Sequence, residues 1–402
     1  MDGQSLARTH QAAISEIRGH LGSLVHCPAA DDGQNPSSDG PAAEMTESTQ
    51  TNAAVALAAE HEAAGRYDDA VNELARAAEG GDADATTELG KHLILGDLGP
   101  HLPEDGARLL VDAVAAGSVE AALRLATLAA LGTYVEQSWP RALGLLVFAA
   151  EKGSSSARSQ LQLFARRRVG DGEPSSGEWR RLAESVDFAT WLAPAPSVSL
   201  HDDPAVRSFP EFTEDAVCSW LIERARGNLR RALVYDAGQG RDIADHMRTN
   251  TAAGFDLMSA DLVQVALQYR MARSVGLPID NMEGPTVLHY EVGEEITNHY
   301  DFLNPGSPNY RDEISRRGER IITFLVYLND DYGGGETEFP KLGMRHKGKR
   351  REGLLFVNAL PTGPPDLRMV HAGTPPTSGE KWIVSQFIRN RVVLNARAER
   401  VA

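Results

Sequence analysis

The sequence predicts a multidomain α + β protein, in which an N-terminal solenoid of helical hairpins precedes a C-terminal β-sandwich or jelly roll supported by helices. Three observations lead to this prediction. Residues 53–168 are rich in Ala and Leu and repeat small residues at a fixed period. Residues 201–392 begin with helix-like segments, which are followed by short β-branched and aromatic runs separated by turn signals. Residues 169–200 include Gly-, Ser- and Pro-rich stretches that are typical of a linker.

The length and composition of the chain indicate a globular protein. A chain of 402 residues has room for two or three domains, and 42% hydrophobic and 24% charged residues are ordinary values for folded domains. The net charge of −16 disfavours binding to nucleic acid or to an anionic membrane surface. The two cysteines, Cys27 and Cys218, are too few for a disulfide framework and fit a reducing compartment.

We expect no targeting or membrane-spanning segment. The sequence has no run of about 18 uncharged apolar residues, and its start lacks the basic and then apolar pattern of a signal peptide. These observations predict a cytoplasmic protein with no nucleic-acid partner and no membrane partner. The oligomeric state stays open.

The first 52 residues divide into two expected parts. Residues 4–25 have the pattern of a short helix. Residues 28–50 are rich in Pro, Gly, Ser, Asp and Thr and carry almost no large apolar side chains, so burial cannot offset the entropy lost on ordering them. We therefore predict a short helix and a disordered linker over residues 1–52.

Residues 53–168 contain three copies of one pattern. Gly81, Gly117 and Gly153 recur every 36 residues. The same period relates three further sets, which are Ala70, Gly106 and Ala142; Ala85, Ala121 and Ala157; and Leu89, Leu125 and Leu161. Such a period is typical of stacked helical hairpins, in which the glycine ends one helix in a left-handed cap and the alanine lets the next helix approach closely.

This pattern resembles the Sel1-like branch of the tetratricopeptide repeats, with its A-x-x-G-x-x-x-A phrase. The resemblance implies an α-helical solenoid, and solenoids of this kind usually bind peptides or proteins on a concave face. We expect the repeats to recruit a partner or a substrate. The alternative is that they only space or solubilise the neighbouring domain.

The C-terminal region is expected to combine two helices with several short strands. Helical patterns cover residues 213–227 and 259–275, and a further short helix fits residues 179–191 inside the linker. The β-rich runs are 285–292, 320–329, 335–339, 353–358, 367–371 and 382–389. Residues 393–402 are expected to form a tail.

The sharpest candidate site consists of His299, Asp301 and the distant His371. Residues i and i+2 of an extended segment point to the same side, so His299 and Asp301 can hold one ion together. A second histidine from another strand completes two His and one carboxylate, the set that non-haem Fe(II) oxygenases use. Lys381 offers a cation to the far carboxylate of a bound 2-oxoacid.

Residues 208–391 resemble the catalytic domain of the prolyl 4-hydroxylases, within the Fe(II)- and 2-oxoglutarate-dependent oxygenases. The matching phrases follow one another in the family's order. They are SFPEFTEDAVCSWLIERA (208–225), Arg248-Thr249-Asn250, VLHYEVGEEITNHYDF (287–302), GERIITFLVYLNDDYGGGETEFP (318–340) and EGLLFVNALPTGPPDLRMVHAGTPPTSGEKWIVSQFIR (352–389). The resemblance implies a double-stranded β-helix, or jelly-roll, oxygenase domain over residues 201–392.

The resemblance also implies roles for individual residues. The iron ligands are expected to be His299, Asp301 and His371. The co-substrate's C5 carboxylate is expected to form a salt bridge with Lys381 and hydrogen bonds with the hydroxyls of Tyr290 and Thr337, which fits the need of a buried carboxylate for charge and donors. The alternatives are a core aromatic residue for Tyr290 and an ordinary strand residue for Thr337. Arg320 is expected at the pocket mouth, where it touches substrate or forms a structural salt bridge.

The implied activity is the hydroxylation of an unactivated C–H bond, coupled to the conversion of 2-oxoglutarate and O2 into succinate and CO2. The expected cofactor is Fe(II), with L-ascorbate assisting by re-reducing iron. The expected substrate is a prolyl residue of a peptide or protein. Two alternatives stay open, which are a hydroxylase of a free amino acid or small metabolite, and a Sel1-repeat binding scaffold with a vestigial oxygenase domain.

Two loops bear on substrate recognition. Residues 303–319 follow the His-x-Asp motif and are expected to form a lid over the site. Residues 345–352 hold five Lys and Arg residues against one Glu. This basic loop can steer an acidic peptide, or it is a solvated turn.

Overall fold

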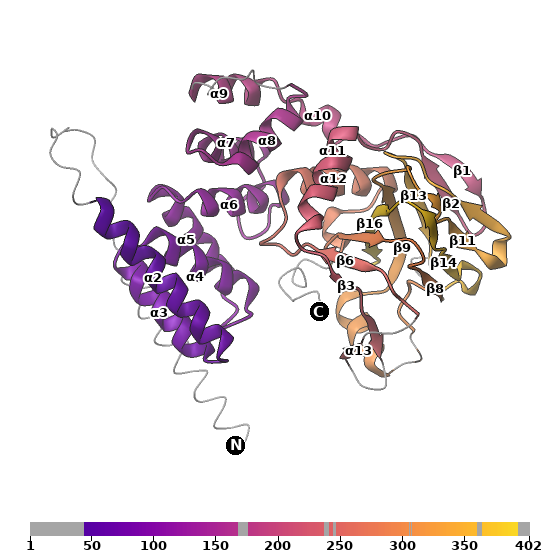
Figure 1. Ribbon diagram of the computed structural model, residues 1–402, viewed down its shortest axis with the longest axis horizontal. Helices are drawn as coiled ribbons and strands as arrows, with labels where there is room; N and C mark the ends of the chain where they lie inside the picture. The colour runs from indigo at the N-terminus through magenta and orange to yellow at the C-terminus, as the bar shows by residue number, and fades with distance from the viewer. Residues whose placement is uncertain are drawn as a thin grey trace. The chain divides into compact units, whose positions relative to one another are not determined.

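A computed structural model describes residues 44–167, 176–236, 241–243, 247–304, 306, 308–359 and 364–392 (Figure 1). The chain divides into two compact units, Met1–Ser159 and Gln160–Ala402. The helix predicted over 4–25, most of the linker predicted over 28–50 and the C-terminal tail lie outside the described residues. Within the part of the chain described here, none of the helices combines the length and the apolar character needed to cross a membrane.

The N-terminal unit is built from helical hairpins that follow one another in space (Figure 1). Its first helix, α2, begins at Glu44, inside the segment predicted to be a disordered linker. The helices are α2 (Glu44–Ala63), α3 (Tyr67–Glu79), α4 (Ala83–Leu95), α5 (Pro103–Ala115), α6 (Val119–Leu131) and α7 (Trp139–Glu151). The boundary between the two units falls within the next helix, α8 (Ser155–Phe164), after Ser159. The repeat predicted from the sequence therefore corresponds to the pairs α3–α4, α5–α6 and α7–α8.

The three repeat glycines end helices in the same way. Gly81, Gly117 and Gly153 have φ angles of 87°, 100° and 96°, a region that side chains larger than hydrogen rarely enter. The amide of each glycine, and that of the residue after it, bond back to carbonyls of the last helical turn, as in a Schellman motif. The predicted left-handed caps are confirmed.

Each cap leads directly into the next helix. The residues after the glycines are Asp82, Ser118 and Ser154, and their side chains accept hydrogen bonds from the amides of the repeat alanines. Those alanines, at positions 85, 121 and 157, have no exposed surface. The 36-residue period thus places the end of one helix, the start of the next and the contact between them at fixed positions.

After the end of α8, the C-terminal unit continues with short helices in the segment predicted to be a linker. They are α9 (Ser176–Glu184) and α10 (Phe188–Trp191). Trp191 packs edge-on against Phe164, with ring centroids 5.3 Å apart, and its indole N–H donates to the Phe164 carbonyl at 2.9 Å. Trp179 is also buried. The segment is therefore folded over much of its length, because its tryptophans supply the apolar surface that a linker lacks.

Two antiparallel sheets dominate the rest of this unit. An eight-stranded sheet has the order β1-β2-β13-β9-β16-β7-β6-β3, and a four-stranded sheet has the order β12-β11-β14-β8. The strands of the large sheet are β1 (Val198–His201), β2 (Val206–Phe209), β3 (Arg230–Arg231), β6 (Thr251–Gly254), β7 (Thr286–Tyr290), β9 (Arg320–Tyr327), β13 (Gly353–Val357) and β16 (Lys381–Arg389). Those of the small sheet are β8 (Ile296–His299), β11 (Thr337–Phe339), β12 (Met344–His346) and β14 (His371–Gly373). The pairs β4 (Val234–Asp236) with β5 (Arg241–Ile243), and β10 (Gly333–Gly334) with β15 (Pro376–Ser378), complete the strands.

The hydrophobic core of this unit joins the two sheets. Leu325 and Ile383 of the large sheet share one buried cluster with Phe339 of the small sheet. The opposite face of the large sheet is covered by α11 (Asp215–Arg226) and α12 (Leu262–Val275), where Gln268 donates to the side chain of Gln386 at 2.7 Å (Figure 1). A sheet region with supporting helices is thus confirmed.

One predicted strand is wrong. Residues 367–371 were expected to be extended, but Leu367–Met369 form a 3₁₀ turn and the strand β14 begins only at His371. The side chain of Asp366 caps this turn by accepting from the amide of Arg368. The turn matters for the site, because it ends two residues before a predicted metal ligand.

Candidate active site

Three of the predicted site residues meet at the edge of the small sheet. His299 is the last residue of β8, and His371 is the first residue of β14 directly opposite it in the antiparallel register. Asp301 follows two residues after His299. Its Oδ1 lies 3.4 Å from Nε2 of His299, and its Oδ2 lies 3.2 Å from Nε2 of His371. One ligand atom from each of the three residues fits within 4.8 Å of the others.

Backbone carbonyls fix the orientation of both imidazoles. Nδ1 of His299 lies 2.8 Å from the Thr297 carbonyl, and Nδ1 of His371 lies 3.0 Å from the Met369 carbonyl. A carbonyl oxygen only accepts, so each Nδ1 carries the proton and donates. Each Nε2 therefore faces Asp301 and is available to a metal. A hydrogen bond from the other ring nitrogen, Nδ1, to a carbonyl is the usual second contact of a metal-bound histidine.

The charges of the cluster stabilise one another in a buried setting. Burial alone would raise the pKa of Asp301, but the charge of His371 and the hydrogen bonds from both imidazoles hold it well below its usual range. Burial and the charge of His371 lower the pKa of His299. Burial would also lower the pKa of His371, but Asp301 raises it. A divalent cation bound here would compete with a proton for Nε2 of His371.

The donor set fits Fe(II). Two neutral imidazole nitrogens and one carboxylate oxygen on one side of an ion leave three positions open on the other. This set, rather than a set of thiolates or a cage of carboxylates, suits a metal that must also bind an exchangeable ligand.

A buried cation without an ion-pair partner among the described residues lies on the neighbouring large sheet. Lys381, the first residue of β16, is 1% exposed, and no carboxylate among the described residues forms an ion pair with it. Its ammonium lies 5.2 Å from the ring centre of Tyr290 and 5.8 Å from that of Tyr327. Burial lowers the pKa of Lys381 to about 8. A buried ammonium with aromatic neighbours and no counter-ion favours an anionic ligand.

Hydroxyl groups accompany this cation. Tyr290 and Thr337 are both buried, and Lys381 pairs with Tyr290 across the β16–β7 ladder. The Tyr327 hydroxyl lies 2.8 Å from the Thr337 hydroxyl. Burial raises the pKa of Tyr290 to about 12 and also raises that of Tyr327, so both phenols keep their protons at neutral pH. These groups can donate to a carboxylate that also contacts Lys381.

Tyr327 was not among the residues singled out from the sequence. A signal was present, because side chains at alternate positions of β9 point to the same face. Thr323, Leu325 and Tyr327 share one face, and that face carries contacts to Asp301, to the core between the sheets and to Thr337. The strand was predicted, but its inward polar residues were not assigned.

The glycine-rich turn before β11 approaches Lys381 closely. Gly335 has a φ of 70°, and a Cβ at this position would lie 2.8 Å from Cε2 of Tyr332 and 3.4 Å from Cδ of Lys381. A side chain here would therefore clash with the Tyr332 ring beside Lys381, as well as straining the backbone.

Arg320 forms a structural ion pair. Its Nε and Nη2 donate to the two carboxylate oxygens of Glu283 at 2.7 and 2.8 Å. Its guanidinium also lies 4.0 Å from the ring centre of Phe387. The burial of Glu283 would raise its pKa, but Arg320 and Arg389 lower it to about 2. Both alternatives given for Arg320 placed it near the site. The contacts with Glu283 and Phe387 agree with the structural salt bridge. A contact between Arg320 and substrate stays a prediction.

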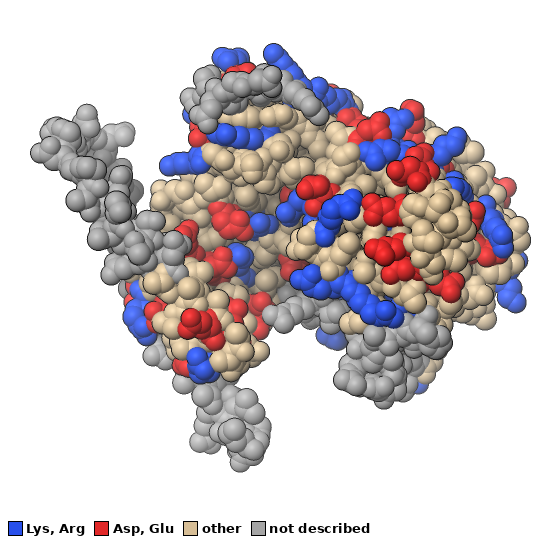
Figure 2. All heavy atoms as spheres, viewed as in Figure 1, with Lys and Arg blue, Asp and Glu red and all other residues tan. Residues whose placement is uncertain are grey.

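The two loops singled out in the sequence differ in structure: the first contains a helix, and the second forms ion pairs. The segment after Asp301 contains a helix, α13 (Pro308–Arg317), whose Glu313 bonds to the buried Arg389 at 2.5 Å. In the basic loop, Arg345 pairs with Glu338, Arg351 with Glu211, and Arg350 with Asp215. These arginines are engaged with carboxylates, and Figure 2 shows Lys and Arg interspersed with Asp and Glu over much of the described surface.

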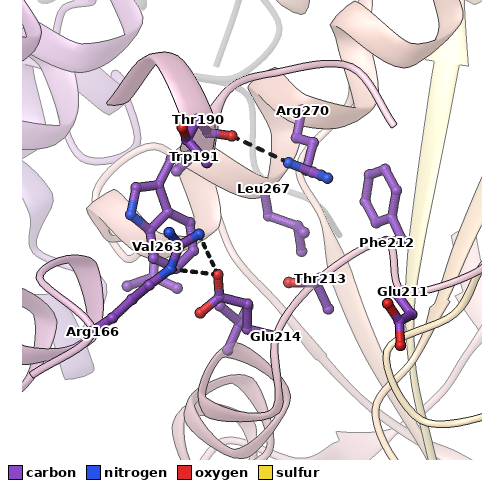
Figure 3. Close-up of a pocket in the computed structure, with 12 residues that line it drawn as sticks. Arg166, Thr190, Trp191, Glu211, Phe212, Thr213, Glu214, Val263, Leu267 and Arg270 are labelled. Atoms are coloured by element: carbon purple, nitrogen blue, oxygen red, sulfur yellow. Dashed lines mark hydrogen bonds and ion pairs between the residues drawn. The ribbon is translucent and has the colours of Figure 1, made fainter. Parts of the chain in front are cut away.

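A separate pocket lies on the helical side of the C-terminal unit (Figure 3). It has a volume of about 150 Å³, and none of its lining residues belongs to the metal cluster. Arg166 donates to Glu214 at 2.7 Å, and Arg270 donates to the Thr190 carbonyl at 3.3 Å, as the dashed lines in Figure 3 mark. The buried ring of Phe212 and the side chain of Leu267 form part of its apolar wall.

Comparison with known proteins defines the class to which this site belongs. Residues 285–389 match the 2OG-Fe(II) oxygenase superfamily. Probable prolyl 4-hydroxylase 9 of Arabidopsis thaliana is 31% identical over 206 residues, which cover 47% of this chain and 69% of that protein. The viral collagen prolyl hydroxylase of Paramecium Bursaria Chlorella virus-1 is 26% identical, with a TM-score of 0.36 over 46% of this chain and 95% of that chain. A Sel1 repeat protein from Oxalobacter formigenes is 18% identical, with a TM-score of 0.27 over 37% of this chain and 63% of that chain.

The chain belongs to the prolyl 4-hydroxylase family of 2-oxoglutarate- and Fe(II)-dependent oxygenases. It is accordingly a dioxygenase that uses Fe(II), 2-oxoglutarate and O2.

Proposed function

We propose that this chain hydroxylates a prolyl residue of a peptide or protein in the cytoplasm, with 2-oxoglutarate as the co-substrate. The observation that carries the proposal is the buried cluster of His299, Asp301 and His371, which has the donor set for Fe(II). The substrate class is supported by the names of the relatives, which are prolyl 4-hydroxylases. The domain that carries the site is a double-stranded β-helix, an assignment supported by the eight- and four-stranded sheets that share one core.

The protein's own groups bind and orient the reactants. His299, Asp301 and His371 hold Fe(II), which supplies the oxidative chemistry when it is bound. The ammonium of Lys381 neutralises the C5 carboxylate of 2-oxoglutarate, and the hydroxyls of Tyr290 and Thr337 donate to it. Tyr327 fixes the Thr337 hydroxyl through the 2.8 Å contact between their oxygens. Lys381, Tyr290 and Thr337 are all buried, so a carboxylate bound to them is shielded from bulk water.

The helical repeats act as a recruiting module for the protein substrate. Their assignment to the Sel1-like type is supported by the 36-residue period, which is matched by three identical glycine caps. Stacked hairpins of this kind present continuous surfaces to peptides and proteins. Deletion of the repeats is expected to raise KM for a protein substrate and to leave KM for 2-oxoglutarate unchanged.

The function is tested by succinate release. Anaerobic protein with Fe(II) and 2-oxoglutarate is expected to show the visible charge-transfer absorption of a 2-oxoacid chelated to Fe(II), and to release succinate when O2 is added. His299→Ala removes one ligand and should abolish both signals. Folded, iron-loaded wild-type protein that shows neither signal would overturn the oxygenase function.

The substrate class is tested by what accelerates turnover. Proline-containing peptides should increase succinate release and gain a hydroxyl group, detected by mass spectrometry. Stimulation by free amino acids alone, with none by peptides or proteins, would instead assign the enzyme to small-molecule hydroxylation.

A further inference from the structure

We propose that Thr323 and Asn358 are positioning residues that orient the Asp301 carboxylate for metal binding. This inference rests on the proposed role of Asp301 as an iron ligand. Thr323 lies within β9, and Asn358 follows β13, so neither is close in sequence to the metal cluster. Both are 1% exposed.

The three residues form one buried chain of hydrogen bonds. The Thr323 hydroxyl donates to Oδ2 of Asp301 at 2.7 Å. The side-chain amide of Asn358 donates to the Thr323 hydroxyl oxygen at 2.8 Å. The chain therefore runs from Asn358 through Thr323 to the carboxylate.

The direction of this chain follows from the chemistry of its members. An ionised carboxylate only accepts hydrogen bonds, so the single proton of the Thr323 hydroxyl must point to Asp301. The hydroxyl oxygen then needs a donor on its other side, and only the NH2 group of Asn358 supplies one. The opposite orientation of the Asn358 amide would place a carbonyl oxygen against the hydroxyl and leave one of the contacts without a proton.

The Asn358 side chain is held in place by the strands around it. Its backbone N–H donates to the Ile321 carbonyl at 2.8 Å, and its own carbonyl accepts from the Asp366 amide at 2.8 Å. Its side-chain Oδ1 is buried, and no group in the described parts of the chain bonds to it. A buried oxygen without a hydrogen-bond partner lowers the stability of the folded protein. The orientation of Asn358 that directs Nδ2 to Thr323 therefore carries this cost at Oδ1.

The contact with Thr323 makes the two oxygens of Asp301 different, because only Oδ2 accepts the hydroxyl proton. Oδ2 receives the hydroxyl proton and also lies 3.2 Å from Nε2 of His371, whereas Oδ1 faces Nε2 of His299 at 3.4 Å. Without the hydroxyl, the carboxylate is free to rotate about its terminal torsion and to bind the metal through both oxygens. A second oxygen on the metal would occupy one of the three positions that the bidentate co-substrate and O2 need.

The test uses Thr323→Val, which keeps the shape of the side chain and removes the hydroxyl, with Thr323→Ser as the matched control that retains it. Co(II) serves as an O2-insensitive probe in the full-length protein. We expect Thr323→Val to weaken Co(II) binding about 10- to 100-fold and to change its visible absorption, because a contact behind a metal ligand has gone. Thr323→Ser should restore both the affinity and the spectrum. Asn358→Leu should change the spectrum in the same direction.

The outcomes separate this proposal from the proposed function. Equal Co(II) affinity and identical spectra for wild type and Thr323→Val would overturn the positioning role, provided that His299→Ala has lost Co(II) binding. Equal Co(II) affinity of the wild type and of His299→Ala would overturn the metal site itself. If Thr323→Val does not fold, as judged by its thermal transition, failure of Asn358→Leu to alter the Co(II) spectrum would overturn the proposal.

Discussion

His299 and His371 lie directly opposite each other on neighbouring antiparallel strands, with their ring centroids 4.3 Å apart. The sheet register alone therefore brings two ligands together from distant parts of the sequence. A shift of one residue would turn one imidazole to the other face of the sheet. Asp301, just beyond the end of β8, then approaches both rings from one side.

Metal binding should stabilise the folded protein through these ligands. A ligand that binds only the folded state adds about 2.7 kcal/mol at a concentration of 100 times its Kd. We expect Co(II) at that concentration to raise the Tm of the wild type and to leave the Tm of His371→Ala unchanged. A shift of equal size in His371→Ala, measured by thermal denaturation with and without Co(II), would contradict the assignment of this residue as a ligand.

The buried ammonium of Lys381 should determine affinity for 2-oxoglutarate. Lys381→Met keeps much of the side-chain volume and removes a charged hydrogen bond, so KM for 2-oxoglutarate should rise about 10- to 100-fold. Succinate release against 2-oxoglutarate concentration measures this change. Lys349→Met, in the exposed basic loop, is the control and should leave KM unchanged. Equal effects of the two variants on KM for 2-oxoglutarate would show that Lys381 does not bind the co-substrate.

The same residue predicts a pH dependence. Burial lowers the pKa of Lys381 to about 8, so the free enzyme carries the charged form below that pH and loses it above. KM for 2-oxoglutarate should therefore rise as pH increases beyond 8, approaching about tenfold per pH unit. Lys381→Met has no such group and should show a flat profile over this range. A flat profile in the wild type as well would mean that the ammonium does not bind the co-substrate.

The sequence allowed the repeats and the His299–Asp301 pair to be predicted from short or regular spacings, whereas the distant His371 was assigned as a ligand through the resemblance to the prolyl 4-hydroxylases. The glycine period describes caps within single hairpins, and the His-x-Asp motif depends only on the alternation of an extended segment. The partners of these residues were harder to foresee. Tyr327 meets Thr337, and Thr323 meets Asp301, through contacts between strands whose register no local pattern specifies.

Charge patterns were the least informative feature of the sequence. The basic loop suggested a surface for acidic partners, but Arg350 and Arg351 reach carboxylates on Asp215 and Glu211, which are distant in the sequence. Likewise, the sequence did not indicate that Arg320 and Arg389 would bind the same carboxylate, that of Glu283. Ion pairs of this kind depend on tertiary distances, which composition and spacing do not contain.

Glu283 should be a major determinant of stability. Its carboxylate accepts from Arg320 and from Arg389, whose side chain has no exposed surface. Glu283→Gln removes the carboxylate partner of Arg320 and one of the two carboxylates that pair with Arg389, which keeps Glu313, so the free energy of unfolding should fall by about 1.5–3 kcal/mol. Glu338→Gln, which loses only the exposed Arg345, should change it by less than about 1 kcal/mol. Urea denaturation at pH 7 measures both, and similar values for the two variants would contradict a structural role for Glu283.

Acid should reduce the difference between Glu283→Gln and the wild type. The pKa of Glu283 in the folded state, about 2, lies below the ordinary value of 4.5, so its ionised form stabilises the fold above pH 4.5. That contribution is lost as pH falls from 4.5 towards 2. The two denaturation free energies should therefore converge over this range, and a constant difference would show that the stabilisation does not depend on the ionised carboxylate.

Two helical glycines provide a matched test of how the repeats pack. A Cβ on Gly106 of α5 would lie 2.5 Å from the Gly90 carbonyl oxygen and 2.8 Å from Cγ1 of Ile94, both on α4. Gly106→Ala should therefore destabilise the N-terminal unit by about 1–3 kcal/mol, even though alanine favours helix formation. Gly144 lies in α7 with no atom within 4 Å of the added carbon, so Gly144→Ala should stabilise the unit by about 0.5–1 kcal/mol. Guanidinium denaturation followed by far-UV circular dichroism distinguishes these signs. Stabilisation by both substitutions would mean that α4 and α5 do not approach each other at Gly106.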